Sequence, residues 1–121
     1  MNIQNMLKQL QREEYYWLYL VLIVLASTLV FYTPYWVDGT FDIVKRHWDG
    51  PNYAYVAFTM YDIPVDHPFT PYKTTQAYFA CHLPFYPLFI KLFSFMGYTN
   101  SMLFTTMLFT MLATLTFYAL L

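Results

Sequence analysis

Two long uncharged stretches dominate the pattern of hydrophobic and polar positions along this chain. No Asp, Glu, Lys or Arg occurs in residues 16–37, and none occurs in residues 101–121. A helix that spans a membrane needs about 20 consecutive, mainly apolar residues. The pattern therefore predicts a first transmembrane helix at 16–37 and a second one at 101–121.

Aromatic side chains gather at both ends of the first stretch, as is typical of the two membrane interfaces. They are Tyr15, Tyr16, Trp17 and Tyr19 at one end and Phe31, Tyr32, Tyr35 and Trp36 at the other. A secretory signal peptide is the alternative, since it also combines a basic start with an apolar run. Bulky residues fill the place of a small-x-small cleavage site, which favours an uncleaved span. The polar residues 1–15 predict an interfacial segment.

Between the two stretches, residues 38–100 predict a large loop with two amphipathic helices. Pro51 suits a first helical position, and an apolar face then recurs at helical spacing, which predicts a helix near 51–61 that lies along the bilayer surface. A second helix is expected near 84–97, where Gly97 suits a helix end. Asn100 or Ser101 can then cap the second span.

These elements define the expected fold class. It is an all-α membrane protein in which two transmembrane helices flank a large extracytoplasmic loop with interfacial helices. The density of basic residues slightly favours a cytoplasmic amino terminus. Because residues 101–121 are still apolar at Leu121, we expect the second helix to be truncated and further transmembrane helices of the same protein to follow. Thr106, Thr110 and Thr114 share one helical face, which favours packing against another helix over a polar substrate path.

Composition and charge agree with a membrane protein and exclude several functions. The chain is 59% hydrophobic and 11% charged, whereas about 25% charged residues is usual in soluble domains. A net charge of −1 gives no electrostatic basis for binding nucleic acid. The lone Cys81 allows neither an intrachain disulfide nor a zinc-binding spacing. With three glycines, the chain has no nucleotide fingerprint, so no cofactor is predicted.

Asp49 is the strongest candidate for chemistry. It precedes Pro51, so it lies just before the positive end of the predicted helix, where a carboxylate is favoured. There it can act as a general base towards a hydroxyl, with the rings of Trp48 and Tyr53 as faces for a sugar or a lipid head group. The alternative is that Asp49 is only a helix cap and that the rings are interface anchors. Asp38, followed by Gly39, predicts a turn.

The other ionisable residues of the loop allow two further hypotheses. Lys45, Arg46 and His47 form a basic cluster that can bind a phosphate or contact anionic lipid head groups. A metal site is the second hypothesis, because carboxylate and imidazole groups both bind divalent ions. The loop contains such groups at Asp62, Asp66, His67 and His82, but they show no recognised ligand spacing. From the residues alone, contact of the basic cluster with lipid head groups is favoured over phosphate binding, and a metal site is not favoured.

Residues 46–53 (RHWDGPNY) and 82–92 (HLPFYPLFIKL), each next to a predicted span, resemble the GT-C superfamily of membrane glycosyltransferases. The resemblance is closest to the family of the second mannosyltransferase of GPI-anchor assembly and its prokaryotic relatives. Two features depart from that family: His82-Leu83 stand where it often has Phe-Phe, and the chain supplies two spans where these enzymes have many.

The resemblance implies transfer of a sugar, which is mannose in the family it is closest to, from a polyprenyl-phosphate donor to the hydroxyl of a lipid or glycan acceptor, with inversion. It implies that Asp49 is the catalytic base and that no nucleotide or metal is required. The substrate-binding residues that we infer with it are Lys45, Arg46, His47, Trp48, Tyr53, His82 and Tyr86. A non-catalytic membrane scaffold that packs through its helices is the alternative. A transporter fragment is less favoured, because neither span carries a charge.

Overall fold

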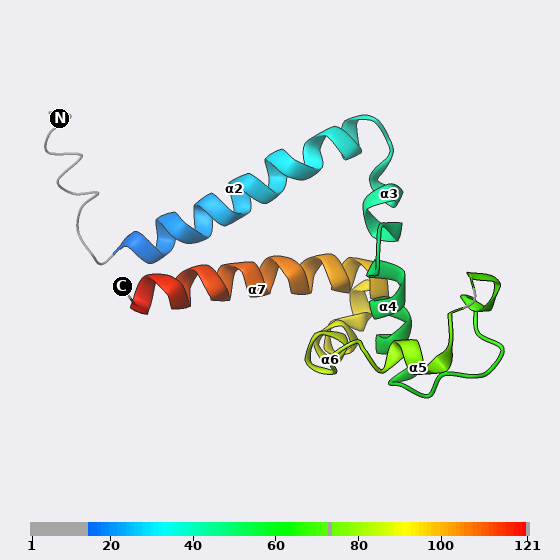
Figure 1. Ribbon diagram of the computed structural model, residues 1–121. Coiled ribbons are helices and arrows are strands. Elements are labelled where there is room, and N and C mark those ends of the chain that lie inside the picture. The colour runs from blue at the N-terminus through cyan, green and yellow to red at the C-terminus, as the bar shows by residue number, and fades with distance from the viewer. Residues whose placement is uncertain (1–14, 73, 121) are drawn as a thin grey trace, which may run out of the picture.

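The computed structural model describes residues 15–72 and 74–120, and in these it forms helices and no strand (Figure 1). This confirms the all-helical prediction for the described residues. The helices, in chain order, are α2 (Tyr16–Val37), α3 (Phe41–Arg46), α4 (Gly50–Thr59), η2 (Thr70–Tyr72), α5 (Gln76–Phe79), α6 (Phe85–Leu92), η3 (Ser94–Met96) and α7 (Tyr98–Leu120). Of the predicted interfacial segment at 1–15, all but Tyr15 lies outside the described residues.

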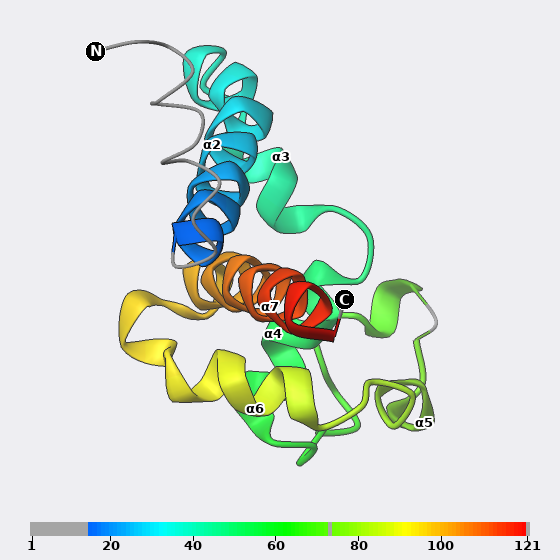
Figure 2. The ribbon, with the colours of Figure 1, turned by 90° about the vertical axis from the view of Figure 1, so that its left-hand side faces the viewer.

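The two long helices, α2 and α7, run in opposite directions, and the short helices gather where α2 ends and α7 begins (Figures 1 and 2). At the other end of the pair, the rings of Tyr16 and Tyr118 lie 5.8 Å apart. By length and composition each helix is able to cross a membrane. Only 6% of the most apolar part of each helix is buried within the chain, whereas the core helix of a soluble protein is mostly buried.

A glycine ends α2. Gly39 has φ +67°, its amide donates to the carbonyl of Trp36, and the next amide, that of Thr40, donates to the carbonyl of Tyr35. This pair of bonds is a Schellman motif, which satisfies carbonyls at the end of a helix and requires a left-handed residue that glycine supplies without strain. The prediction of a turn at Asp38 and Gly39 is confirmed, and this turn directs the chain from α2 into α3.

The core of the short helices lies on the apolar face of α4. Val56 and Ala57 are fully buried, Val56 in a cluster with Ile63 and Phe79. Ala57 packs in a second cluster with Ile90 of α6 and Met102 of α7. Val56 and Ala57, two residues of the predicted apolar face, therefore pack against α6, α7 and the loop after α4.

Gly50 brings the start of α4 close to α7. A Cβ atom at Gly50 would lie 3.2 Å from Cε and 3.3 Å from Sδ of Met102. Such contacts are closer than ordinary van der Waals packing, so the missing side chain allows this approach. The residue before Gly50, Asp49, is thereby held near the first turns of α7.

The helix boundaries on both sides of Gly97 differ from the prediction. The helix expected near 84–97 is divided, since α6 ends at Leu92 and η3 follows. The last helix begins at Tyr98, three residues before the predicted start, and Ser101 is a buried residue within it. Its hydroxyl donates to the carbonyls of Phe93 and Gly97 and so ties the two elements together instead of capping α7.

Two short helices, α3 and α5, were not predicted. In α3 the acidic Asp42 lies in the first turn and Lys45 in the last, with Nζ of Lys45 3.4 Å from Oδ1 of Asp42. Acidic residues favour the first turn of a helix and basic residues the last turn, so this charge pattern was a usable signal. For α5, which has four residues, no comparable signal is present.

Candidate functional site

The carboxylate of Asp49 is held by two side chains. Asp49 occupies the N-cap position of α4, where its backbone carbonyl accepts a hydrogen bond from the amide of Tyr53 at 3.0 Å. Its side chain makes no capping bond to the backbone. Instead, Oδ1 accepts a hydrogen bond of 2.8 Å from the hydroxyl of Tyr78 and one of 3.2 Å from Nδ2 of Asn52. The alternative of a simple side-chain cap therefore does not describe Asp49.

Both of these bonds reach the same oxygen of Asp49. In the part of the chain that the structure describes, no hydrogen bond reaches Oδ2, and Asp49 is exposed. An ionised carboxylate has about four acceptor positions on its two oxygens. The arrangement fixes one oxygen and leaves the other open to a hydroxyl from outside the chain.

A row of aromatic rings connects Asp49 with α6. The ring of Tyr78 lies 5.2 Å from that of His82, and the ring of His82 lies 4.5 Å from that of Tyr53. Tyr53 in turn lies 5.0 Å from Tyr86, edge to face. Such edge-to-face pairs contribute roughly 0.5–1.5 kcal/mol each beyond the area they bury. The row brings together four residues predicted from the two sequence motifs: Asp49, Tyr53, His82 and Tyr86.

Tyr86 anchors this row to α7. Its hydroxyl lies 2.6 Å from Oγ1 of Thr106 and donates to the carbonyl of Met102 at 3.1 Å. Burial raises the pKa of Tyr86, which keeps the phenol neutral. One residue of the predicted threonine face thus contacts α6.

His82 carries a buried nitrogen without a partner. The residue is 4% exposed, and among the described residues Nδ1 has no hydrogen-bond partner. A buried polar atom left unpaired costs about 1–3 kcal/mol. The backbone of His82 is satisfied separately, since its carbonyl accepts a hydrogen bond from the hydroxyl of Tyr61. The site therefore contains a buried nitrogen, on the ring that packs between Tyr53 and Tyr78, without a partner among the described residues.

The remaining predicted residues, Lys45, Arg46, His47 and Trp48, are not bonded to this row. Lys45 pairs with Asp42, and its Nζ lies 5.2 Å from the centre of the ring of Phe41. Within the described residues, no hydrogen bond or ion pair joins Lys45, Arg46 or His47 to Asp49. They are nevertheless its neighbours along the chain, at the end of α3.

Trp48 is exposed and has an unusual backbone conformation. It is 88% exposed, and its φ of +51° lies in the left-handed region. For a bulky residue this conformation costs roughly 1–2 kcal/mol. The turn between α3 and α4 therefore presents a large aromatic ring to the surroundings, one residue before Asp49, at a cost in stability.

Tyr78 is the site residue that sequence reasoning missed. It comes from α5, 29 residues after Asp49, and lies in neither of the two motifs. Because the bond depends on how the loop between α4 and α6 folds back, no spacing along the chain predicts it.

The metal hypothesis has no support in the described residues, which contain no group of three or more His, Cys, Asp or Glu side chains able to hold an ion. His67 is buried, and its Nδ1 already accepts a hydrogen bond from the amide of Phe69 at 3.2 Å. Asp62 and Asp66 are exposed at the surface.

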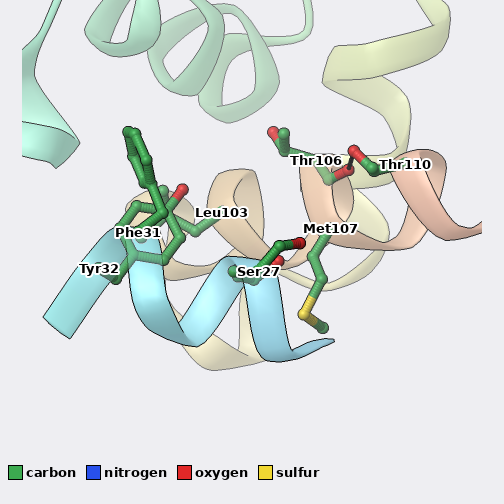
Figure 3. Close-up of a pocket in the computed structure, with 8 residues that line it drawn as sticks. Ser27, Phe31, Tyr32, Leu103, Thr106, Met107 and Thr110 are labelled. Carbon is green, nitrogen blue, oxygen red and sulfur yellow. Dashed lines mark hydrogen bonds between the residues drawn. The ribbon is translucent and has the colours of Figure 1, made fainter. Parts of the chain in front are cut away.

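A pocket of about 320 Å³ lies between α2 and α7 (Figure 3). Its lining includes the hydroxyls of Ser27, Thr28, Thr106 and Thr110. The hydroxyls of Thr106, Thr110 and Thr114 each donate to the carbonyl four residues earlier, as do many threonines in long helices. Through Thr106, which also contacts Tyr86, the pocket adjoins the aromatic row.

The bond between Tyr78 and Asp49 predicts an effect of pH. This hydrogen bond, with smaller effects of desolvation and of the Asp49 charge, raises the pKa of Tyr78 above the ordinary phenol value of about 10. The contribution of this hydrogen bond to the stability of the folded protein is present at lower pH, and it is lost as the pH rises through the raised pKa of Tyr78. The ultraviolet absorbance of the protein is followed as the pH is raised, and the curve of Tyr78→Phe is subtracted. The difference should show one phenol that ionises above pH about 10.

The same difference recorded in an Asp49→Asn background provides the control. We expect the phenol to ionise at lower pH there, because the charged acceptor is gone. An unchanged titration in that background would contradict the bond.

Neither protein-family models nor characterised proteins nor solved structures give a match for this chain. The function therefore rests on the residues of the site and on the two motifs.

Proposed function

We propose that this chain is the catalytic amino-terminal part of a GT-C-type membrane glycosyltransferase, a mannosyltransferase by the likeness of its motifs. It transfers the sugar of a polyprenyl-phosphate donor to a hydroxyl of a lipid or glycan acceptor and inverts the anomeric centre. The observation that carries the proposal is the carboxylate of Asp49, fixed at one oxygen, open at the other, and linked by aromatic rings to the 82–92 motif.

In this mechanism Asp49 is the general base. Its open oxygen, Oδ2, accepts the proton of the acceptor hydroxyl while the hydroxyl oxygen forms a bond to the anomeric carbon. The bond from that carbon to the phosphate oxygen breaks on the opposite face, and its electron pair leaves with the polyprenyl phosphate. One carbon–oxygen bond is made and one is broken, the proton remains on Asp49, and the anomeric configuration is inverted.

The departing phosphate gains negative charge, which cationic side chains stabilise. Lys45 and Arg46, at the end of α3, are the lysine and the arginine of the described chain nearest to Asp49 in sequence. Lys45 is paired with Asp42, and an exposed pair of this kind contributes only about 0–1 kcal/mol. Exchange of that partner for a phosphate therefore costs little.

The site is proposed to lie at the extracytoplasmic or lumenal surface of a membrane that α2 and α7 cross. The length and apolar character of the two helices support their crossing of a membrane. The short helices gather towards the end of the pair where α2 ends and α7 begins (Figure 1), so the carboxylate would meet a lipid-linked donor at the boundary between lipid and water. Further transmembrane helices of the same protein would complete the donor site.

The test of the proposal is a transfer assay in membranes that contain the full-length protein. Polyprenyl-phosphate mannose is the donor, polyprenyl-phosphate glucose is the comparison, and membranes without the protein are the blank. Transfer of sugar with release of polyprenyl phosphate supports the proposal. Absence of transfer with both donors would favour the scaffold, whose function requires only that the helices pack.

Substitution of Trp48 separates an effect of its exposed ring on donor binding from an effect on the stability of the protein. Trp48→Gly removes the ring and relieves the left-handed backbone, so we expect the thermal stability to be unchanged or slightly higher. The KM for the donor should rise roughly 3- to 10-fold, the value of one lost aromatic contact.

Val65→Gly is the matched control, since it removes another exposed apolar side chain of the same loop and should leave the KM unchanged. Equal KM values for Trp48→Gly and the unsubstituted protein would remove Trp48 from the donor site.

A further inference from the structure

We propose that Tyr78 is a positioning residue of this site: with Asn52 it fixes Oδ1 of Asp49, so that Oδ2 faces the acceptor hydroxyl. This inference rests on the proposed function, and it adds a residue that lies outside both motifs. Neither Tyr78 nor Asn52 contacts the reacting atoms in this arrangement, because each acts through Asp49.

Three sets of contacts hold Tyr78 in place. The next residue, Phe79, is fully buried in the core cluster with Val56 and Ile63. The ring of Tyr78 itself packs against that of His82 at 5.2 Å. Its backbone amide donates to the carbonyl of Thr75 at 3.0 Å and its carbonyl accepts from the amide of Cys81 at 3.1 Å. The Tyr78 hydroxyl, the hydrogen-bond donor to Asp49, is therefore in position before any substrate binds.

Asn52 approaches the same oxygen from a different element. It lies three residues after Asp49 in the first turn of α4, and its Nδ2 donates at 3.2 Å. Two donors from α4 and α5 on one oxygen restrict rotation of the carboxyl group about its bond to Cβ. A general base that is already oriented avoids the loss of rate that follows from a misplaced group.

Neutral donors suit this role. A lysine or arginine at the same place would form an ion pair and compete with the proton that the base must accept. The hydroxyl of Tyr78 and the amide of Asn52 orient the carboxylate without adding a full positive charge. The cationic residues Lys45 and Arg46 are not bonded to Asp49 in the described chain, so the base and the proposed phosphate ligands are kept apart.

The experiment compares Tyr78→Phe and Asn52→Ala with Tyr72→Phe in the full-length protein in membranes. Tyr72 is an exposed tyrosine of the same loop whose hydroxyl has no hydrogen bond among the described residues. For Tyr78→Phe we expect kcat to fall roughly 10- to 100-fold. Asn52→Ala should give a smaller loss, because its bond to Oδ1 is longer. Tyr72→Phe should transfer sugar at the unsubstituted rate.

Binding of the sugar donor separates a positioning role from a structural defect. The amount of polyprenyl-phosphate mannose bound at saturation and its Kd should be unchanged in Tyr78→Phe, since Asp49 does not bind the sugar donor in this mechanism. A loss of bound donor in proportion to the loss of kcat would mean that part of the protein is misfolded, and would overturn the inference.

Two results distinguish this inference from the proposed function. If Asp49→Asn abolishes transfer while Tyr78→Phe and Asn52→Ala behave like Tyr72→Phe, the positioning role is wrong and the enzyme stands. If Asp49→Asn transfers sugar normally, or no form transfers it, the proposed function is wrong and the positioning role falls with it.

Discussion

Replacement of Asp49 by Asn is expected to lower the rate of sugar transfer by roughly 10²- to 10⁴-fold, the usual contribution of a general base. Asn retains the shape of the side chain and an oxygen that accepts hydrogen bonds from Tyr78 and Asn52. It loses the negative charge and the ability to take a proton. The fold should therefore survive while the chemical step fails, and kcat should fall more than the KM for the donor rises.

The matched control is Asp62→Asn. Asp62 is another exposed acidic residue of the same loop, and its removal changes the net charge by the same amount. We expect Asp62→Asn to transfer sugar at the unsubstituted rate at equal expression. Similar losses in both variants would assign the effect to the charge of the loop and not to a base at Asp49.

Phe79→Ala should have the largest effect on stability, a loss of about 3–5 kcal/mol. The side chain is 0% exposed and contacts the rings of Tyr55, His67 and Phe69 as well as Val56. Among the described residues, the members of this cluster other than Phe79 come from α4 and from the loop after it, so the cavity would loosen the loop between α4 and α6. Thermal unfolding of the purified protein in detergent, together with limited proteolysis at residues 61–84, measures the effect.

Phe95→Ala provides the comparison for this stability measurement. Phe95 is 83% exposed, so its truncation should change the free energy of unfolding by no more than about 0.5 kcal/mol. The loosened loop of Phe79→Ala should also release Tyr78, the preceding residue in the chain, and lower transfer. Equal melting temperatures for the two variants would contradict the core described here.

The long elements of the fold were predictable because hydrophobic length alone defines them. An uncharged run gave α2 its observed bounds, Tyr16–Val37, and predicted most of α7. The start of α7 was not predictable from caps, since Ser101 bonds back to Phe93 across the turn at Gly97. That bond depends on the packing of α6 and α7, so no local pattern contains it.

The face of α4 illustrates a second limit of sequence reasoning. Helical spacing of Val56 and Ala57 indicated an apolar face, and such a face exists. Periodicity states which residues share a face but not what covers it. An apolar face of a helix can be covered either by lipid or by other parts of the protein. Here Val56 and Ala57 are covered by protein, namely by Phe79, Ile90 and Met102.

The site was predictable only in part, for the same reason. Asp49, Tyr53, His82 and Tyr86 were identified from two motifs, and packing of α4 on α6 brings their side chains into one row. Tyr78 completes that row through a bond across 29 residues, and a single tyrosine among 13 in the sequence carries no signal of its own. Contacts that depend on loop closure have to be found in three dimensions.

The central claim is that Asp49 is the base in an inverting transfer from a lipid phosphate. The most direct measurement is the rate of mannose transfer from polyprenyl-phosphate mannose, with the anomeric configuration of the product, for the full-length protein and for Asp49→Asn at equal expression. We predict a product of inverted configuration from the unsubstituted protein and almost none from Asp49→Asn. Equal transfer by both proteins, or a product of retained configuration, would contradict the claim.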